Sequence, residues 1–163
     1  MRTRSKSVIQ QQARAIRRQL AQRLKKTNVL RFLGFKLVRA EPRRVTLRFR
    51  VRPHHLQVHQ VVHGGVMAAL VDTAGGLATY MSVPPGTRVA TVEMKLNFLE
   101  AIEKGTVTAD ARVLRCGRHF SVVDCDVRDS VGRLAGKALM TFAINPAPLV
   151  TPQLSPRTAA KSR

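Results

Sequence analysis

The chain has 163 residues, of which 44% are hydrophobic and 23% charged, and its formal net charge at pH 7 is +20. That length and apolar fraction predict one compact globular domain with a sizeable core. No apolar run reaches the ~18 to 20 residues that a membrane-spanning helix needs, because Asp72 interrupts the only segment that comes near. Two cysteines, Cys116 and Cys125, fit neither a metal cluster nor a disulfide framework, so we expect reduced thiols and a reducing compartment such as the cytoplasm.

The positive charge is concentrated at the two ends of the chain. Residues 1–31 carry ten Lys or Arg and no acid, and residues 148–163 carry three and no acid. We therefore divide the chain into a basic N-terminal segment (1–31), a central domain (32–147) and a Pro-containing tail (148–163) that we expect to be disordered.

An amphipathic basic helix is predicted within the N-terminal segment. Its apolar residues recur at three- and four-residue spacing: Ile9, Ala13, Ile16, Leu20 and Leu24. Such a helix could lie on an anionic membrane, contact nucleic-acid phosphates, or be a targeting segment that sends the protein to the mitochondrial matrix. Alternatively, its apolar stripe packs on its own domain or on a second subunit. The sequence leaves these alternatives open.

The central domain is predicted to be α+β. "RRVTLRFRV" and "RVATVEMKLNFL" alternate apolar and polar residues, as do runs at 105–115, 119–128 and 133–144. In the second of these stretches, the alternation places Met94 on one face of the strand and Thr91 on the other. An apolar helix is expected from about residue 64 to 81, and strands joined by short links form an antiparallel sheet that this helix must cover.

One carboxylate lies in the middle of this helix, "VVHGGVMAALVDTAGGLATYM". The side chains that share a helical face with Asp72 are all very small: Ala68, Ala69, Gly75 and Gly76. Glycine inside a helix costs roughly 1 kcal/mol relative to alanine, so the two glycines need a reason. Either they allow close packing, or they clear a path for a ligand to a carboxylate that acts as base or nucleophile. The structural alternative is a core acid hydrogen-bonded to backbone or to a threonine such as Thr73 or Thr91.

The tripeptide "HGG" at the start of the helix, which begins with His63, has the features of an oxyanion site. Glycines there let a ligand approach the free backbone amides of the first turn, and these amides favour a developing negative charge. His63 alone is more often a capping or packing residue than a catalyst. An acid nine residues later, in a helix of small residues that precedes four strands, makes the combination much more specific, so we count His63 among the candidate catalytic residues.

These stretches, with "TVEMKLNFLEAI" and "GRHFSVVDCDVRDSVGRLAGKALMTF", resemble the hotdog-fold acyl-CoA thioesterases of the phenylacetyl-CoA and 4-hydroxybenzoyl-CoA thioesterase type. The resemblance covers residues 32–145 and leaves out both basic ends. It implies an antiparallel β-sheet wrapped around a central α-helix. It also implies a homodimer whose sheets join edge to edge, or a dimer of dimers.

The resemblance implies roles for individual residues. Asp72, nine residues after His63, matches the nucleophile or general base of the family. Gln57 would help to hold the thioester and the attacking water, and the backbone amide of Gly64 would polarise the thioester carbonyl.

Further residues are assigned less directly by the same resemblance. Thr91 would assist from the start of the following strand, and Gly117 and Arg118 lie where the family contacts the CoA phosphates. No cofactor is implied. We expect no metal site either, because no acid or cysteine accompanies the three histidines of the preceding loop: His54, His55 and His59.

We therefore predict a hydrolase that cleaves acyl-CoA thioesters into a free acid and CoA. The alternative is a non-catalytic hotdog domain that senses acyl-CoA while its basic N-terminal helix contacts nucleic acid or membrane. Residues 1–31 are too few for a helix-turn-helix, and the presence of both Asp72 and Gln57 favours catalysis. A hotdog dehydratase, which pairs a catalytic histidine with its acid differently, ranks lower.

The spacing along the helix predicts that two chains build the site. His63 and Asp72 are two and a half turns apart, so they leave the helix on opposite faces, roughly 13 Å apart along its axis. The Gly64 amide and the Asp72 carboxylate of one chain therefore cannot act on the same carbonyl. If both act on one substrate, they come from two central helices that run antiparallel across a two-fold axis.

Overall fold

The computed structural model describes residues 17–18, 20–22 and 24–145. The elements up to the central helix are α2 (Asn28–Phe32), β1 (Lys36–Glu41), β2 (Arg44–Arg50), the 3-10 turn η1 (Pro53–His55) and α3 (Gly64–Tyr80). Four consecutive strands follow: β3 (Arg88–Phe98), β4 (Thr106–Cys116), β5 (Phe120–Arg128) and β6 (Leu134–Asn145). None of the helices in this part of the chain is long and apolar enough to cross a membrane.

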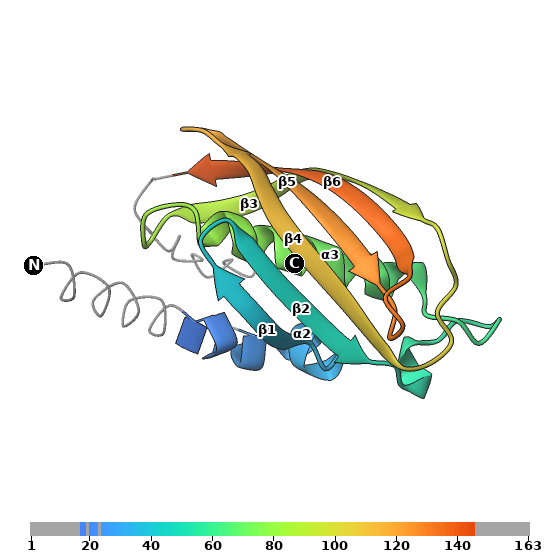
Figure 1. Ribbon diagram of the computed structural model, residues 1–163. Helices are drawn as coiled ribbons and strands as arrows, with labels where there is room; N and C mark the ends of the chain where they lie inside the picture. Colours follow the sequence, from blue (N-terminus) through green and yellow to red (C-terminus); the bar gives the residue numbers. More distant parts are fainter. Residues whose placement is uncertain (1–16, 19, 23, 146–163) are drawn as a thin grey trace, which may run out of the picture.

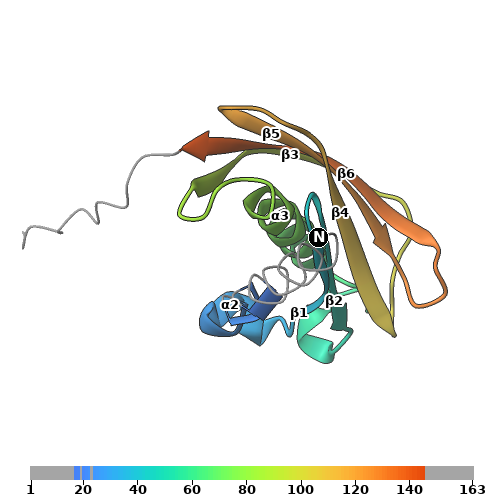
Figure 2. The same ribbon diagram turned by 60° about the vertical axis from the view of Figure 1, so that its left-hand side comes forward.

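The six strands form one antiparallel sheet in the order β1-β2-β4-β5-β6-β3, so β1 and β3 are its edges. The sheet curves around α3, which lies on its concave side (Figure 1, Figure 2). This arrangement confirms the predicted α+β hotdog fold. The central helix begins at the predicted residue, Gly64, and ends one residue before the predicted end.

The core lies between α3 and the concave face of the sheet. The alternation predicted for β2 is confirmed, because Val45, Leu47 and Phe49 are all buried there. The helix contributes the apolar side chains that meet them: Met67, Leu70, Val71, Ala74 and Ala78. A sheet with one apolar face is stable only when that face is covered, and α3 covers it.

Both cysteines are free thiols. Cys116 lies opposite Ser121, whereas Cys125 lies between Ala111 and Ala138 of the neighbouring strands, so the two cysteines do not oppose each other. Cys125 is buried, and this burial raises the pKa of its thiol.

β3 departs from the alternation that its sequence predicts. Its ladder with β6 is interrupted between Thr91 and Glu93, where β3 carries one extra residue. Thr91 lies opposite Phe142 and Met94 lies opposite Met140, and both β6 residues are buried. Because directly opposed residues share a face of the sheet, Thr91 lies on the concave face together with Met94. The prediction that the two residues face opposite ways is wrong, because a β-bulge reverses the phase of the strand.

The basic N-terminal segment packs on the domain where the structure describes it. Leu20 and Leu24 are 0% and 5% exposed and belong to the core, and Arg17 Nη2 donates to the Val38 carbonyl of edge strand β1 at 3.0 Å. These contacts support packing of the helix on its own domain. The tail 148–163 and three residues of the predicted stripe lie outside the described residues: Ile9, Ala13 and Ile16. The division of the chain at residues 31 and 147 stays a prediction.

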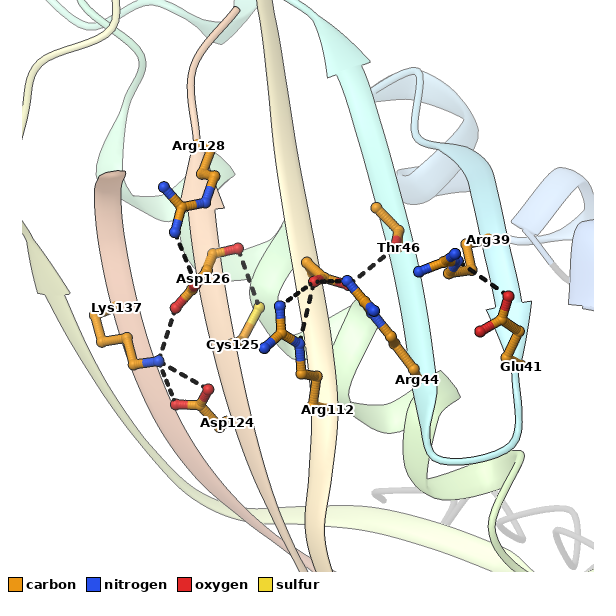
Figure 3. Close-up of polar contacts among 11 residues, drawn as sticks. Arg39, Glu41, Arg44, Thr46, Arg112, Asp124, Cys125, Asp126, Arg128 and Lys137 are labelled. Carbon is orange, nitrogen blue, oxygen red and sulfur yellow. Dashed lines mark hydrogen bonds and ion pairs between the residues drawn. The ribbon is translucent and has the colours of Figure 1, made fainter. Parts of the chain in front are cut away.

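Charged side chains on the convex face form ion pairs across the strands (Figure 3). Asp110 of β4 contacts Arg44 of β2 at 2.7 Å and Arg112 of its own strand at 2.9 Å. Lys137 of β6 contacts two carboxylates of β5: Asp124 at 2.6 Å and Asp126 at 2.7 Å. The strand register decides which charged side chains of neighbouring strands lie close enough to form these pairs.

Asp110 has the most strongly perturbed carboxyl of this network. Burial alone would raise its pKa, but hydrogen bonds from Arg44, Arg112 and Thr46 outweigh burial and hold the pKa at about 2. The Asp110 side chain is 17% exposed, while both arginines are considerably more exposed. Because solvent screens such pairs, we expect a contribution of about 1 kcal/mol rather than the full value of the pKa shift.

We predict that this contribution depends on pH. A pKa of about 2 in the folded state lies below the unfolded value of about 3.9, so the stabilisation is present above pH 4 and is lost as the pH falls towards 2. Asp110→Asn should therefore lower the free energy of unfolding by about 1 kcal/mol at pH 7 and by much less near pH 2. Urea denaturation at both pH values measures the difference.

Glu103→Gln is the control, because Glu103 makes no ion pair with the residues that the structure describes. This control should change the free energy of unfolding little at pH 7. If Asp110→Asn lowers the free energy of unfolding by the same amount at both pH values, the electrostatic explanation is contradicted.

Candidate functional site

Asp72 borders an open cavity of about 630 Å³ beside the central helix. The helix wall of this cavity consists of side chains on one face of α3: Asp72, Thr73, Gly76, Leu77 and Tyr80. The facing wall comes from the loop before β3, from β3 itself and from β6: Pro85, Gly86, Thr87, Arg88, Val89, Thr91 and Phe142. Asp72 is half-buried, so its carboxylate is within reach of a ligand that enters this cavity.

The Asp72 carboxylate is held from the edge strand. Thr91 Oγ1 donates a hydrogen bond to Asp72 Oδ1 at 2.7 Å, and the described residues donate none to Oδ2. Thr91 can make this contact because the bulge in β3 turns its side chain to the concave face. The threonine contact that the sequence suggested for a structural acid is therefore present, while Thr73 donates instead to the Ala69 carbonyl. Asp72 is both hydrogen-bonded and open to the cavity.

The two glycines next to Asp72 serve different purposes. A Cβ on Gly75 would stand 2.7 Å from Met140 Cε and 2.9 Å from Phe142 Cζ, so α3 packs on β6 without room for a side chain there. A Cβ on Gly76 would stand 3.5 Å from Phe142, which is ordinary van der Waals contact, and Gly76 borders the cavity. Gly75 is therefore explained by the close packing of α3 on β6. Gly76 fits the other explanation, in which small residues leave the way to the Asp72 carboxylate open for a ligand.

The first turn of α3 lies at the other end of β3. His63 is the N-cap of the helix, and its Nδ1 accepts a hydrogen bond from the Gly65 amide at 2.9 Å, so the side chain has a capping role. A Cβ on Gly64 would stand 3.1 Å from the ring of Phe98, the last residue of β3. The Gly64 amide donates to none of the described residues, as an oxyanion site requires.

The loop before the helix is anchored by a buried histidine. His55 packs against the Phe49 ring with the centroids 4.7 Å apart, and its carbonyl accepts a hydrogen bond from the His63 amide at 2.8 Å. Burial, and then the neighbouring His54, lower the pKa of His55. Gln57 follows in the same loop, where its Oε1 accepts from the His59 amide at 3.1 Å. The described residues contain no group of three or more His, Cys, Asp or Glu that could hold a metal.

One chain does not bring all the expected site residues together. Asp72 and Thr91 are in contact, but Gln57, His63 and Gly64 do not line the Asp72 cavity. The structure therefore separates the carboxylate from the helix start, as the helical spacing predicts.

Gly117 and Arg118 line a second cavity of about 800 Å³. This cavity shares three residues with the first, all in the loop between α3 and β3: Pro85, Gly86 and Thr87. Sequence reasoning missed this loop and Tyr80 as walls of the site. The tripeptide "PPG" signals a turn, and Gly86 has a φ of +86°, but only the folded chain shows that the turn lies beside Asp72.

Comparison with known protein families supports a common origin for the central domain. Residues 59–135 match the family model described as thioesterase superfamily. A protein of Saccharolobus solfataricus with the name "Putative esterase" is 32% identical over 120 residues, which cover 74% of this chain and 85% of that protein. The 1,4-dihydroxy-2-naphthoyl-CoA hydrolase of Listeria monocytogenes is 25% identical over 112 residues, which cover 69% of this chain and 91% of that protein.

A solved structure has the same architecture. The crystal structure of a thioesterase from Haemophilus influenzae is 25% identical in sequence and superposes with a TM-score of 0.74. The match covers 82% of this chain and 92% of that chain.

Alanine substitutions should separate the roles of the two glycines. Both Gly75→Ala and Gly76→Ala gain helix propensity, but only the methyl group at position 75 overpacks the contact with Met140 and Phe142. We expect Gly75→Ala to have a free energy of unfolding about 1–3 kcal/mol lower than Gly76→Ala, as measured by denaturant titration. Equal stabilities of the two variants would contradict the packing assigned to Gly75.

Proposed function

The chain belongs to the thioesterase superfamily, and we propose that it hydrolyses acyl-CoA thioesters to a free acid and CoA. The observation that carries this proposal is the Asp72 carboxylate, which borders an open cavity and has one oxygen held by Thr91. A positioned carboxylate with its second oxygen free of protein donors can take a proton or attack a carbonyl. The name of the Listeria monocytogenes relative supports CoA thioesters as the substrate class.

The reaction adds water across the C–S bond of the thioester. As a general base, Asp72 takes a proton from water while the oxygen of that water attacks the thioester carbon, and the proton later passes to the departing CoA sulfur. As a nucleophile, Asp72 attacks the carbon itself and CoA leaves as the thiolate; water then hydrolyses the mixed anhydride to the free acid and the Asp72 carboxylate, and the proton released passes to the CoA sulfur. Both routes need a donor that stabilises negative charge on the carbonyl oxygen, and we assign that role to the Gly64 amide.

A second copy of the chain is proposed to supply that donor across the edge of β3. β3 pairs with β6 on one side, and no strand within the described chain pairs with its other side. Val92 and Phe98 of this edge strand are 55% and 57% exposed. An uncovered edge of eleven residues readily pairs with another strand.

The geometry of one chain indicates what such pairing would bring together. Within the chain, Thr91 contacts Asp72 near one end of β3, and Phe98 packs on Gly64 at the other end. If two copies of β3 pair antiparallel about their middle, the Thr91 end of one strand lies near the Phe98 end of the other. Asp72 of one chain would then approach Gly64 of the partner subunit, together with the loop that carries Gln57, so a homodimer would hold two composite sites.

The second cavity is proposed to receive part of the CoA. Gly117 and Arg118 line it, and it adjoins the Asp72 cavity along the loop of Pro85 to Thr87. Arg118 is exposed, and a guanidinium suits a phosphate group because its paired N–H groups match phosphate oxygens. Neither this role for Gly117 and Arg118 nor the composite site requires more than a dimer, and a dimer of dimers would leave both proposals unchanged.

The first prediction on function concerns Asp72. A thiol-release assay over aryl, short-, medium- and long-chain acyl-CoAs should find at least one substrate, and Asp72→Asn should lower its rate of hydrolysis by ~100-fold or more. The reason is that the amide can neither accept the proton nor attack the carbonyl. Circular dichroism should show that the variant is folded.

Glu93→Gln is the matched control for Asp72→Asn. Glu93 Oε1 also accepts a hydrogen bond from a threonine, Thr141 at 2.8 Å, but on the convex face of the sheet. This variant should keep the wild-type rate. If Asp72→Asn hydrolyses the substrate at the wild-type rate, Asp72 is neither the general base nor the nucleophile. If the wild type releases CoA from none of the substrates, the acyl-CoA-binding alternative is favoured.

The second prediction on function concerns the composite site. Gln57→Ala and Asp72→Asn should each damage both sites of their own homodimer. A hybrid dimer of the two variants would hold one doubly damaged site and one intact site, so it should recover up to about half of the wild-type activity per dimer. Co-expression with two different affinity tags allows the hybrid to be isolated and assayed. Activity near zero in a verified hybrid would rule out a site shared between two chains.

A further inference from the structure

Only some cations of the sheet and its turns pair with a carboxylate. Six of them each contact a carboxylate: Arg39, Arg44, Arg112, Arg128, Arg133 and Lys137. Several others form no ion pair with any residue that the structure describes, and four of these gather where β1 begins and β2 ends: Lys36, Arg48, Arg50 and Arg52. We call these four residues the β2-end cation cluster.

The strand register places like charges of this cluster next to one another. Lys36 of β1 lies directly opposite Arg48 of β2. Arg50 follows two residues later on the same face, opposite Thr106 of β4. Opposed side chains have their Cβ atoms about 5 Å apart, and like charges in such positions destabilise a sheet. An anion bound between these cations would relieve that repulsion.

The cluster surrounds a hollow of about 300 Å³. The other residues that line it are Gly34, Phe49 and Thr106. No atom lies within 4 Å of the place where a Cβ on Gly34 would stand, so the hollow is open on that side. Its lining thus combines four cations with a hydroxyl and contains no carboxylate. Arginine forks and a lysine ammonium are the groups that bind phosphate oxygens in proteins.

The acids of the chain do not neutralise the cluster. All nine lie within the described residues, and seven accept a contact from a cation or a threonine elsewhere: Glu41, Asp72, Glu93, Asp110, Asp124, Asp126 and Asp129. Glu100 and Glu103 remain. The loop of Glu103 reaches the end of β2, where the Gly105 carbonyl accepts from the Val51 amide at 2.9 Å, yet Glu103 forms no ion pair with the cluster.

We propose that this hollow binds the phosphoryl groups of a soluble phosphate ester that carries two or more of them, as a nucleoside diphosphate does. Four cations match two phosphoryl groups, since a phosphate monoester carries about −1.5 to −2 charges at pH 7. The concave shape suits a compact ligand better than a flat lipid surface. The two stripe residues that the structure describes, Leu20 and Leu24, are buried in the core and so are not available for insertion into lipid.

The site is separate from the proposed reaction. Its lining shares no residue with the Asp72 cavity or with the cavity of Gly117 and Arg118. Binding at the cluster can therefore be measured without an acyl-CoA substrate, and failure of one proposal leaves the other standing.

Calorimetric titration of the full chain with inorganic pyrophosphate, at physiological salt, tests the proposal. The double variant Arg48→Gln/Arg50→Gln should bind pyrophosphate at least about 10-fold more weakly than the wild type. The control Arg18→Gln/Arg115→Gln removes two exposed cations elsewhere, and it should bind within about 3-fold of the wild type. Unchanged binding by the first variant, or an equal loss in both variants, would overturn the proposal.

Thermal melting separates a ligand site from a structural role. Because the cluster repels itself, Arg48→Gln/Arg50→Gln without ligand should melt at least as high as the wild type, and pyrophosphate should raise the Tm of the wild type only. A lower Tm for the ligand-free variant would show that the arginines stabilise the fold, which contradicts the proposal. Binding to phosphatidylglycerol vesicles that depends on Arg48 and Arg50, without binding of pyrophosphate, would replace the soluble ligand by a lipid headgroup.

Discussion

The hydrogen bond from Thr91 to Asp72 is the interaction on which the candidate site depends, because it joins the edge strand to the central helix beside the open cavity. Regular alternation would send Thr91 to the convex face, where Glu93 and Thr141 form a pair of the same kind. One extra residue in β3 sends the threonine inward instead. The strand thus carries one threonine–carboxylate contact on each face, and the inner one borders the open cavity.

The packing of α3 on β6 sets the space beside that bond. Gly75 lets the helix lie directly on Met140 and Phe142, and Gly76, one position further along, borders the cavity. A helix normally avoids glycine, so this pair marks the place where close packing and access to Asp72 are needed within two residues. On the opposite side of the sheet, ion pairs join Arg44, Arg112 and Lys137 to carboxylates, whereas the lining of the β2-end cation cluster contains no carboxylate.

The sequence predicted the fold well because period-two strands and one apolar helix permit few arrangements. It also drew attention to Asp72 through four very small neighbours on one helical face, and the structure places this residue beside an open cavity, while its catalytic role stays a prediction. It could not predict the phase of Thr91, because a bulge needs one inserted residue and has no fixed residue pattern. Contacts such as Arg44 with Asp110, 66 residues apart, follow from strand register and are visible only in the folded chain. The burial of Leu20 and Leu24 likewise supports one of the alternatives that the amphipathic pattern left open, packing on the chain's own domain.

The central claim is that Thr91 acts through Asp72, and a double-mutant cycle on kcat/KM tests it most directly. The cycle compares the wild type, Thr91→Val, Asp72→Asn and the double variant on one acyl-CoA that the wild type hydrolyses. Our account predicts that Thr91→Val lowers kcat/KM of the wild type but causes no further loss in the Asp72→Asn background. If the two losses multiply instead, Thr91 and Asp72 act independently, and the account is wrong.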